Sequence, residues 1–290
     1  MATPAQWVAG ARPRTLPAAV SPVVAGTGVA AYAGQVVWWK AALALVVALA
    51  LQVGVNYAND YSDGIRGTDA ERVGPMRLVG SGAATAHAVK LAAFAAFGVA
   101  AIAGLVLAAT TAWWLVAVGL VSIVAAWFYT GGKRPYGYLA LGELMVFVFF
   151  GLVAVVGTTY VQTRTWEWAA LYAAVGVGAL ACAILVVNNL RDVPTDTATG
   201  KRTLAVVLGD ERTRYLYLLL VLAATAAVVA VAVATTWWAL VGLLFLVRMI
   251  APLRTVLGGA RGLALVPVLQ QTGIGELTWA LLVAVPLFLR

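Results

Sequence analysis

The chain has 290 residues, of which 63% are hydrophobic and 10% are charged, and its formal net charge is +8. Soluble domains carry about 25% charged residues, so this composition excludes a soluble globular protein and indicates an integral membrane protein. In such a protein the excess of Lys and Arg reflects which loops lie in the cytoplasm, and we expect no nucleic-acid partner. The single cysteine, Cys182, excludes a disulfide framework and a CxxC metal site.

Apolar runs follow one another along the whole chain. A transmembrane helix needs about 17–25 predominantly apolar residues. Nine runs meet this requirement: 16–33, 40–60, 89–109, 113–130, 139–161, 168–190, 214–234, 237–257 and 264–289. Tryptophan pairs at several run ends, such as Trp113 and Trp114, are typical of the membrane interface. The sequence therefore predicts an all-α membrane protein with nine transmembrane helices, in a single domain that covers residues 1–290.

Basic residues are distributed unequally between the two sets of connecting loops. Fifteen of the 19 Lys and Arg residues fall on the side of the N-terminus, whereas Lys40, Arg164 and Arg290 fall on the other side. Because cytoplasmic loops are enriched in Lys and Arg, we predict a cytoplasmic N-terminus and an outer C-terminus in a bacterial plasma membrane. The two long loops, at about 61–88 and 191–213, are then cytoplasmic, and the chemistry is expected at this face.

Two similar polar clusters end the second and sixth apolar runs. They consist of Asn56, Asn59, Asp60 and Asp63 in the first and of Asn188, Asn189, Asp192 and Asp196 in the second. In each cluster an Asn precedes an Asp by four residues, which places the two side chains on one helical face. A carboxylate at membrane depth is costly and marks a candidate functional site. The repetition predicts two four-helix halves and a ninth helix around a central cavity that opens at the cytoplasmic side.

The residue types in these clusters favour magnesium. Carboxylate and amide oxygens without His or Cys point to Mg²⁺ rather than to zinc. The predicted metal ligands are Asn56, Asp60, Asp63, Asp192 and Asp196. A diphosphate fits such a site, because the metal bridges it to the carboxylates while Arg and Lys bind its other oxygens. The basic residues in the same loops are Arg66, Arg72, Arg77, Arg191, Lys201 and Arg202.

A third polar segment, YTGGKRPYGYLALGE, follows the fourth apolar run. Tyr129 and Lys133 are four residues apart, and the two glycines between them let the backbone approach a ligand. Lys133 is either a phosphate contact or a cytoplasmic anchor. Glu143, at the end of the segment, either faces the cavity or lies at the membrane surface.

At these residues the chain resembles the UbiA-type intramembrane prenyltransferases, which have nine helices, two Asp-rich motifs at the cytosolic ends of helices two and six, and a Tyr-x-x-x-Lys element. The second motif is NNLRDVPTD, and the element runs from Tyr129 to Lys133. The first motif departs from the family pattern Asn-x-x-x-Asp-x-x-x-Asp, because Gly64 holds its third place. The third ligand of this motif is therefore either Asp63 or Asp69.

Four longer stretches resemble the MenA branch of this family, the 1,4-dihydroxy-2-naphthoate prenyltransferases of menaquinone synthesis. They are ARPRTLPAAVSPVVAGT, NYANDYSDGIRGTD, ERVGPMRLVGSG and YTGGKRPYGYLALGE. The resemblance implies Mg²⁺-dependent transfer of a polyprenyl group from polyprenyl diphosphate to dihydroxynaphthoate, with loss of CO₂ and diphosphate. The product is demethylmenaquinone, and the long isoprenoid tail is expected to leave into membrane lipid.

The expected roles divide the polar residues into two groups. The catalytic group is Asp60, Asp63, Asp192, Asp196 and Lys133. The substrate-binding group is Asn56, Asn59, Arg72, Arg77, Tyr129, Asn188, Asn189, Lys201, Arg202, Arg12 and Arg14. Within it, the N-terminal pair Arg12 and Arg14 is the candidate contact for the naphthoate carboxylate.

Other functions fit part of the pattern. A transporter explains internal repeats, although its site normally lies near the bilayer centre rather than at one surface. A non-catalytic quinone-binding scaffold has no use for metal ligands. Within the enzyme class, 4-hydroxybenzoate, homogentisate or a glycerophosphate lipid fits the residues as well as dihydroxynaphthoate does, and only the resemblance chooses among these acceptors.

Overall fold

The computed structural model describes residues 2–67 and 76–290 of the chain. Within them, seven helices are long and apolar enough to cross a membrane, and a bent pair raises the number to eight. The seven are α3 (Trp38–Arg66), α4 (Ala86–Thr110), Gly142–Thr163, α8 (Trp168–Ala198), α10 (Asp210–Ala234), Trp237–Leu257 and Gly262–Phe288. The predicted all-α, multi-pass membrane fold is confirmed.

Three of these spans change helix type along their length. Gly142–Thr163 consists of α6 (Gly142–Val146), a π-helical segment (Phe147–Val156) and α7 (Gly157–Thr163). The other two each begin with a 3-10 turn that leads into α11 (Phe245–Leu257) and α12 (Val266–Phe288). The predicted span 113–130 is α5 (Leu115–Phe128), a shorter apolar helix.

The N-terminal span is bent before it enters the bundle. A first part, Pro4–Thr15, contains α1 (Pro4–Gly10) and meets α2 (Pro17–Tyr32) at an angle of 50°. Arg12, at the bend, has a positive φ of 53°, which is uncommon for a residue other than glycine. Because proline lacks a backbone N–H donor, Pro13 and Pro17 suit the two helix starts on either side of Thr15.

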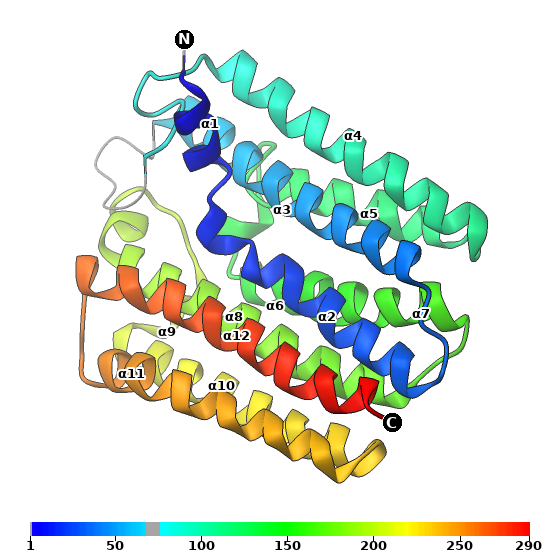
Figure 1. Cartoon of the computed structure of the whole chain (residues 1–290). Coiled ribbons are helices and arrows are strands. Elements are labelled where there is room, and N and C mark those ends of the chain that lie inside the picture. Colours follow the sequence, from blue (N-terminus) through cyan, green and yellow to red (C-terminus); the bar gives the residue numbers. More distant parts are fainter. Residues whose placement is uncertain (1, 68–75) are drawn as a thin grey trace.

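The long helices lie side by side, and the C-terminal ends of α3 and α8 lie at the end of the bundle that carries the N-terminus (Figure 1). The C-terminus lies at the opposite end. The two cluster-bearing helices also pack similarly, because α3 packs along α4 and α8 packs along α10. Each cluster helix therefore pairs with the long helix that follows it, as expected of a duplicated unit.

Helix α8 is the centre of the bundle, since 72% of its apolar window is buried, against 33% for α3 and for α4. Small residues at the contacts of α8 allow the neighbouring helices to approach it closely. A Cβ atom on Gly151 of the π-helical segment would lie 2.6 Å from the Ala174 carbonyl oxygen and 2.9 Å from the Cα of Gly178. Glycine at 151 thus allows the π-helical segment to pack directly against α8.

A buried lysine joins three helices at the end opposite the clusters. Lys40, near the start of α3, is 6% exposed. Its ammonium donates to the carbonyl oxygens of Thr110 at 3.1 Å and Val161 at 2.8 Å, and to the Thr111 hydroxyl at 2.8 Å. These carbonyls lie at the C-terminal ends of α4 and α7, where a cation is favourable.

Candidate active site

A cavity of about 1030 Å³ lies between α2, α3, α4, α5, the π-helical segment and α8. Its polar residues include Arg12, Arg14, Thr15, Gln52, Asn56, Asn59, Asp63, Arg77, Tyr129, Asn188, Asn189, Arg191 and Lys201. Its apolar residues include Val23, Ala44, Ala48, Leu107, Leu115, Ala154 and Val161. A cavity with both kinds of wall suits a ligand that has a polar head and a long apolar tail.

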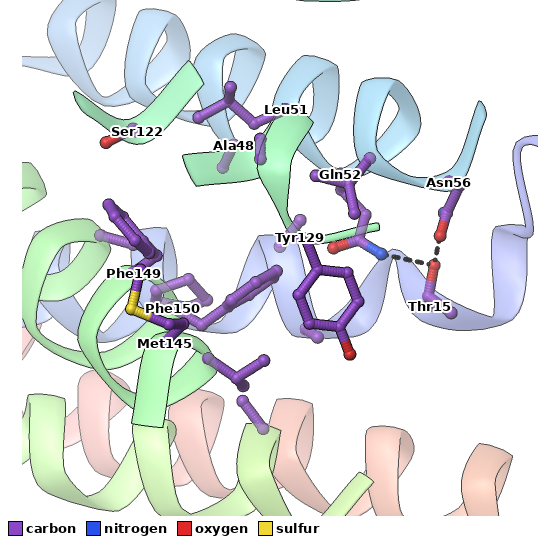
Figure 2. Close-up of a pocket in the computed structure, with 18 of the residues that line it drawn as sticks. Thr15, Ala48, Leu51, Gln52, Asn56, Ser122, Tyr129, Met145, Phe149 and Phe150 are labelled. Carbon is purple, nitrogen blue, oxygen red and sulfur yellow. Dashed lines mark hydrogen bonds between the residues drawn. The ribbon is translucent and has the colours of Figure 1, made fainter. Parts of the chain in front are cut away.

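Tyr129 lies between these two environments. Figure 2 shows its ring between the polar pair Thr15 and Asn56 on one side and the apolar Phe149 and Phe150 on the other. The Thr15 hydroxyl accepts hydrogen bonds from the amide nitrogens of Gln52 at 2.8 Å and Asn56 at 3.0 Å (Figure 2). The bend in the N-terminal span is thereby fastened to α3.

Asp60 is directed away from the cavity and fastens the segment that begins at Met76. Its two carboxylate oxygens accept the backbone N–H groups of Leu78 at 2.7 Å and Val79 at 3.0 Å. The residue is 1% exposed and does not line the cavity. At the preceding residue, the side-chain carbonyl oxygen of Asn59 accepts the Thr130 hydroxyl at 2.8 Å.

Asp63 does line the cavity and interacts with two other polar side chains. One of its oxygens accepts the Tyr138 hydroxyl at 2.8 Å, and the other lies 3.4 Å from an Arg77 guanidinium nitrogen. Burial, followed by the nearby Asp63 carboxylate, raises the pKa of Tyr138, so the hydroxyl stays protonated and donates. The alternative ligand, Asp69, and the predicted phosphate contact Arg72 lie outside the described residues.

The second cluster is buried and held by cations. The two carboxylate oxygens of Asp192 accept hydrogen bonds from Nε and Nη2 of Arg191 at 2.6 and 2.7 Å. The ion pair is therefore bidentate. The same guanidinium donates to Asn188 at 2.9 Å. Asp196 lies 3.5 Å from the ammonium of Lys201, which lines the cavity.

Glu143 joins the third segment to the second cluster. One of its carboxylate oxygens accepts the side-chain amide of Asn189 at 2.9 Å, and the residue is 8% exposed. Asn189 lines the cavity, whereas Glu143 lies behind it. Glu143 is therefore buried, and it neither faces the cavity nor lies at the surface.

The structure separates the predicted residues into two sets. Those that line the cavity are Arg12, Arg14, Asn56, Asn59, Asp63, Arg77, Tyr129, Asn188, Asn189 and Lys201. Those that do not line it are Asp60, Lys133, Asp192, Asp196 and Arg202. Among the second set, Lys133 and Arg202 are exposed, while the three carboxylates are buried beside cavity residues.

Sequence patterns missed several polar residues of the site. Gln52 precedes Asn56 by four residues, so the polar face of this helix could have been extended by one more turn. Tyr138 and Thr15 carry no comparable spacing signal, because their partners are distant in the chain.

The donor chemistry fits magnesium bound together with a phosphorylated ligand. Across residues 2–67 and 76–290, no three His, Cys, Asp or Glu side chains converge as a metal cage. Mg²⁺ is usually held by one or two carboxylates, with substrate phosphates and water completing its shell. Asp63 and Asp196 are carboxylates of the type that Mg²⁺ prefers, and each lies beside a cation, Arg77 or Lys201, of the type that binds phosphate oxygens.

The helical fold and this cavity define a multi-pass membrane protein built to enclose an amphipathic ligand. A model of the UbiA prenyltransferase family matches residues 19–262. The chain belongs to the UbiA prenyltransferase family.

Named relatives match nearly the whole chain. The 1,4-dihydroxy-2-naphthoate octaprenyltransferase of Mycobacterium tuberculosis is 57% identical, over 98% of this chain and 97% of its own. The Escherichia coli protein of the same name is 35% identical, over 98% of this chain and 95% of its own.

Solved structures share the fold at low sequence identity. The apo structure of a UbiA homolog from Aeropyrum pernix aligns with a TM-score of 0.73 at 15% identity, covering 93% of this chain and 97% of that one. A UbiA homolog from Archaeoglobus fulgidus, bound to DMAPP and Mg²⁺, aligns at 0.65 and 15% identity, covering 97% and 98%.

Proposed function

We propose that the protein transfers a polyprenyl group from polyprenyl diphosphate to 1,4-dihydroxy-2-naphthoate. The reaction releases CO₂ and diphosphate and gives demethylmenaquinol, the hydroquinone form of demethylmenaquinone, in a step of menaquinone biosynthesis. The observation that carries this proposal is the 57% identity to an octaprenyltransferase of that name along 98% of the chain. The cavity supports it, because polar residues suited to a diphosphate adjoin apolar walls suited to a prenyl chain.

Magnesium is the proposed cofactor. Asp63 and Asp196 would hold it, and Asn56, Asp60 and Asp192 would join them by exchanging their present hydrogen-bond partners. Bound Mg²⁺ would connect these oxygens to the diphosphate and stabilise the charge that develops on the leaving group.

Side chains of the protein bind the diphosphate and the acceptor and stabilise the charge on the prenyl group. Arg77 and Lys201 bind diphosphate oxygens, because both line the cavity beside a carboxylate. The Tyr129 ring, between the polar and apolar walls, stabilises positive charge on the first prenyl carbon. The bend at Arg12 and Arg14 supplies guanidinium groups for the acceptor carboxylate.

The proposed topology places nine spans across a bacterial plasma membrane, with the N-terminus and the mouth of the cavity in the cytoplasm. The distribution of Lys and Arg supports this orientation. Helix α5 has 14 residues, or about 21 Å at the usual helical rise. It therefore crosses with the help of the turns at its two ends.

The test is a product assay with purified protein in detergent. Dihydroxynaphthoate and a labelled polyprenyl diphosphate should give demethylmenaquinol, which air oxidises to demethylmenaquinone for identification by mass, together with CO₂ and diphosphate. Chelation of Mg²⁺ should abolish the product and its restoration should recover it. A product formed only with 4-hydroxybenzoate or homogentisate would refute the acceptor assignment. Movement of substrate across a vesicle membrane without diphosphate release would favour a transporter.

A further inference from the structure

The segment between α5 and α6 is attached to both halves of the molecule. On the first half, Arg66 donates to the carbonyl oxygens of Thr130 and Gly132. On the second half, Leu139 forms a parallel backbone bridge with Arg202. The segment therefore spans the gap between the ends of α3 and α8, where the two clusters lie.

Tyr138, in the middle of this segment, contacts groups from both halves. Its hydroxyl donates to Asp63 at 2.8 Å. The Lys201 ammonium lies 5.1 Å from the centroid of its ring, within the range of a cation–π interaction. The Arg66 guanidinium also lies 5.3 Å from that centroid. One side chain thus holds a carboxylate of the first half by its hydroxyl and a cation of the second half by its ring.

We propose that Tyr138 is a positioning residue that sets the metal ligand Asp63 and the phosphate-binding Lys201 against the same diphosphate. This inference rests on the proposed function, which supplies Mg²⁺ and diphosphate as the ligands. The two contacts use different parts of the side chain, so they can be removed separately. Partners that orient a metal ligand typically change metal affinity by about 10–100-fold when they are removed.

The hydroxyl is tested with Tyr138→Phe, which keeps the ring beside Lys201. We expect this variant to bind Mn²⁺, used as a spectroscopic substitute for Mg²⁺, about tenfold more weakly in the presence of inorganic pyrophosphate. Electron paramagnetic resonance of the purified protein in detergent measures this binding without any prenyl transfer. In the transfer assay, raising Mg²⁺ should restore kcat, which a distorted fold would not allow.

The ring is tested with Tyr138→Leu, which removes the hydroxyl contact with Asp63 and the ring contacts with Lys201 and Arg66. At saturating Mn²⁺ we expect pyrophosphate to bind about threefold more weakly to this variant than to Tyr138→Phe, because only the leucine variant has lost the cation–π interaction. The unfolding midpoint of each variant is measured alongside, and Tyr138→Phe carries the decision if the leucine variant unfolds.

The matched control is Tyr136→Phe, in the same short helical turn. Its hydroxyl donates to the Ala125 carbonyl oxygen at 2.7 Å and not to a residue of either cluster. Loss of that bond should leave Mn²⁺ affinity within about twofold of the wild type. Equal weakening in both tyrosine-to-phenylalanine variants would show a general loop effect and overturn the proposal.

Two results separate this inference from the proposed function. Wild-type protein that binds Mn²⁺ with pyrophosphate, together with an unaffected Tyr138→Phe variant, would overturn the role of Tyr138 alone. Metal binding that depends on Tyr138, in a protein that does not prenylate dihydroxynaphthoate, would refute the acceptor and leave the positioning role supported. Absence of Mn²⁺ binding by the wild type would overturn both.

Discussion

Asp60 holds the backbone of Leu78 by a hydrogen bond of 2.7 Å, although the two residues are 18 positions apart. A second bond to the next amide completes the contact. Arg77 precedes these two amides directly, so the carboxylate at the end of α3 fixes the backbone from which this guanidinium reaches Asp63. A carboxylate of the first cluster is thus a structural anchor.

Replacing Asp60 should therefore affect both stability and activity. Asp60→Ala removes an acceptor from two buried backbone N–H groups, which costs about 1–3 kcal/mol for each unsatisfied group. We expect a lower unfolding temperature and faster proteolysis near Arg77. Asp60→Asn retains one carbonyl acceptor, so it should stay folded while transfer falls at least about tenfold. Full transfer activity in Asp60→Asn would contradict a role in the metal site.

Two lysines allow a direct comparison of cavity and surface. Lys201 lines the cavity beside Asp196, whereas Lys133 is exposed and outside it. Lys201→Ala should raise KM for polyprenyl diphosphate about tenfold, the loss expected for one charged hydrogen bond. Lys133→Ala should change KM by less than about threefold if the lysine remains at the surface as an anchor. Steady-state kinetics with varied diphosphate separates the two outcomes, and a larger effect at Lys133 would restore its predicted phosphate contact.

Close packing of the π-helical segment on α8 gives a stability prediction. In Gly151→Ala the new methyl group meets the Ala174 carbonyl oxygen at 2.6 Å, so the helices must separate. We expect destabilisation of about 1–3 kcal/mol, as in other overpacked sites. Gly98→Ala, on α4, is the control, because nothing lies within 4 Å of its added Cβ. Thermal unfolding in detergent should show a drop only for Gly151→Ala, and equal midpoints would contradict the packing described.

The apolar wall predicts an effect on prenyl chain length. Ala48 of α3 lines the cavity, so Ala48→Phe shortens the space for the tail. Activity with long polyprenyl diphosphates should fall roughly tenfold, while activity with short ones is kept. Val46→Phe places the same ring on an exposed position of the same helix and should leave the chain-length profile unchanged. A uniform loss with all chain lengths in Ala48→Phe would argue against a tail-binding wall.

Helices and cluster positions follow from short-range patterns in the sequence. Each predicted apolar run corresponds to a helical segment, because burial in lipid requires long stretches without charge. Asn56 and Asp60 lie in the C-terminal half of α3, and the family assignment is confirmed by the match over residues 19–262. The number of spans is only partly confirmed, since α5 is shorter than the others.

Side-chain directions within the clusters did not follow from spacing. A four-residue interval places Asn56 and Asp60 on one face, but the carboxylate turns to Leu78 because a buried backbone amide there needs an acceptor. The bend at Arg12 and the link from Tyr138 to Asp63 likewise depend on contacts between distant segments. Such contacts are determined by tertiary packing, which no local pattern encodes.

The hydrogen bonds of the Lys40 ammonium stiffen the end of the bundle that lies opposite the two clusters. One ammonium holds the ends of α4 and α7 to the start of α3. Thermal breathing of these helices should therefore be smallest there and increase toward the end that carries the aspartates. We therefore expect a bulky aromatic molecule to enter or leave at that freer end.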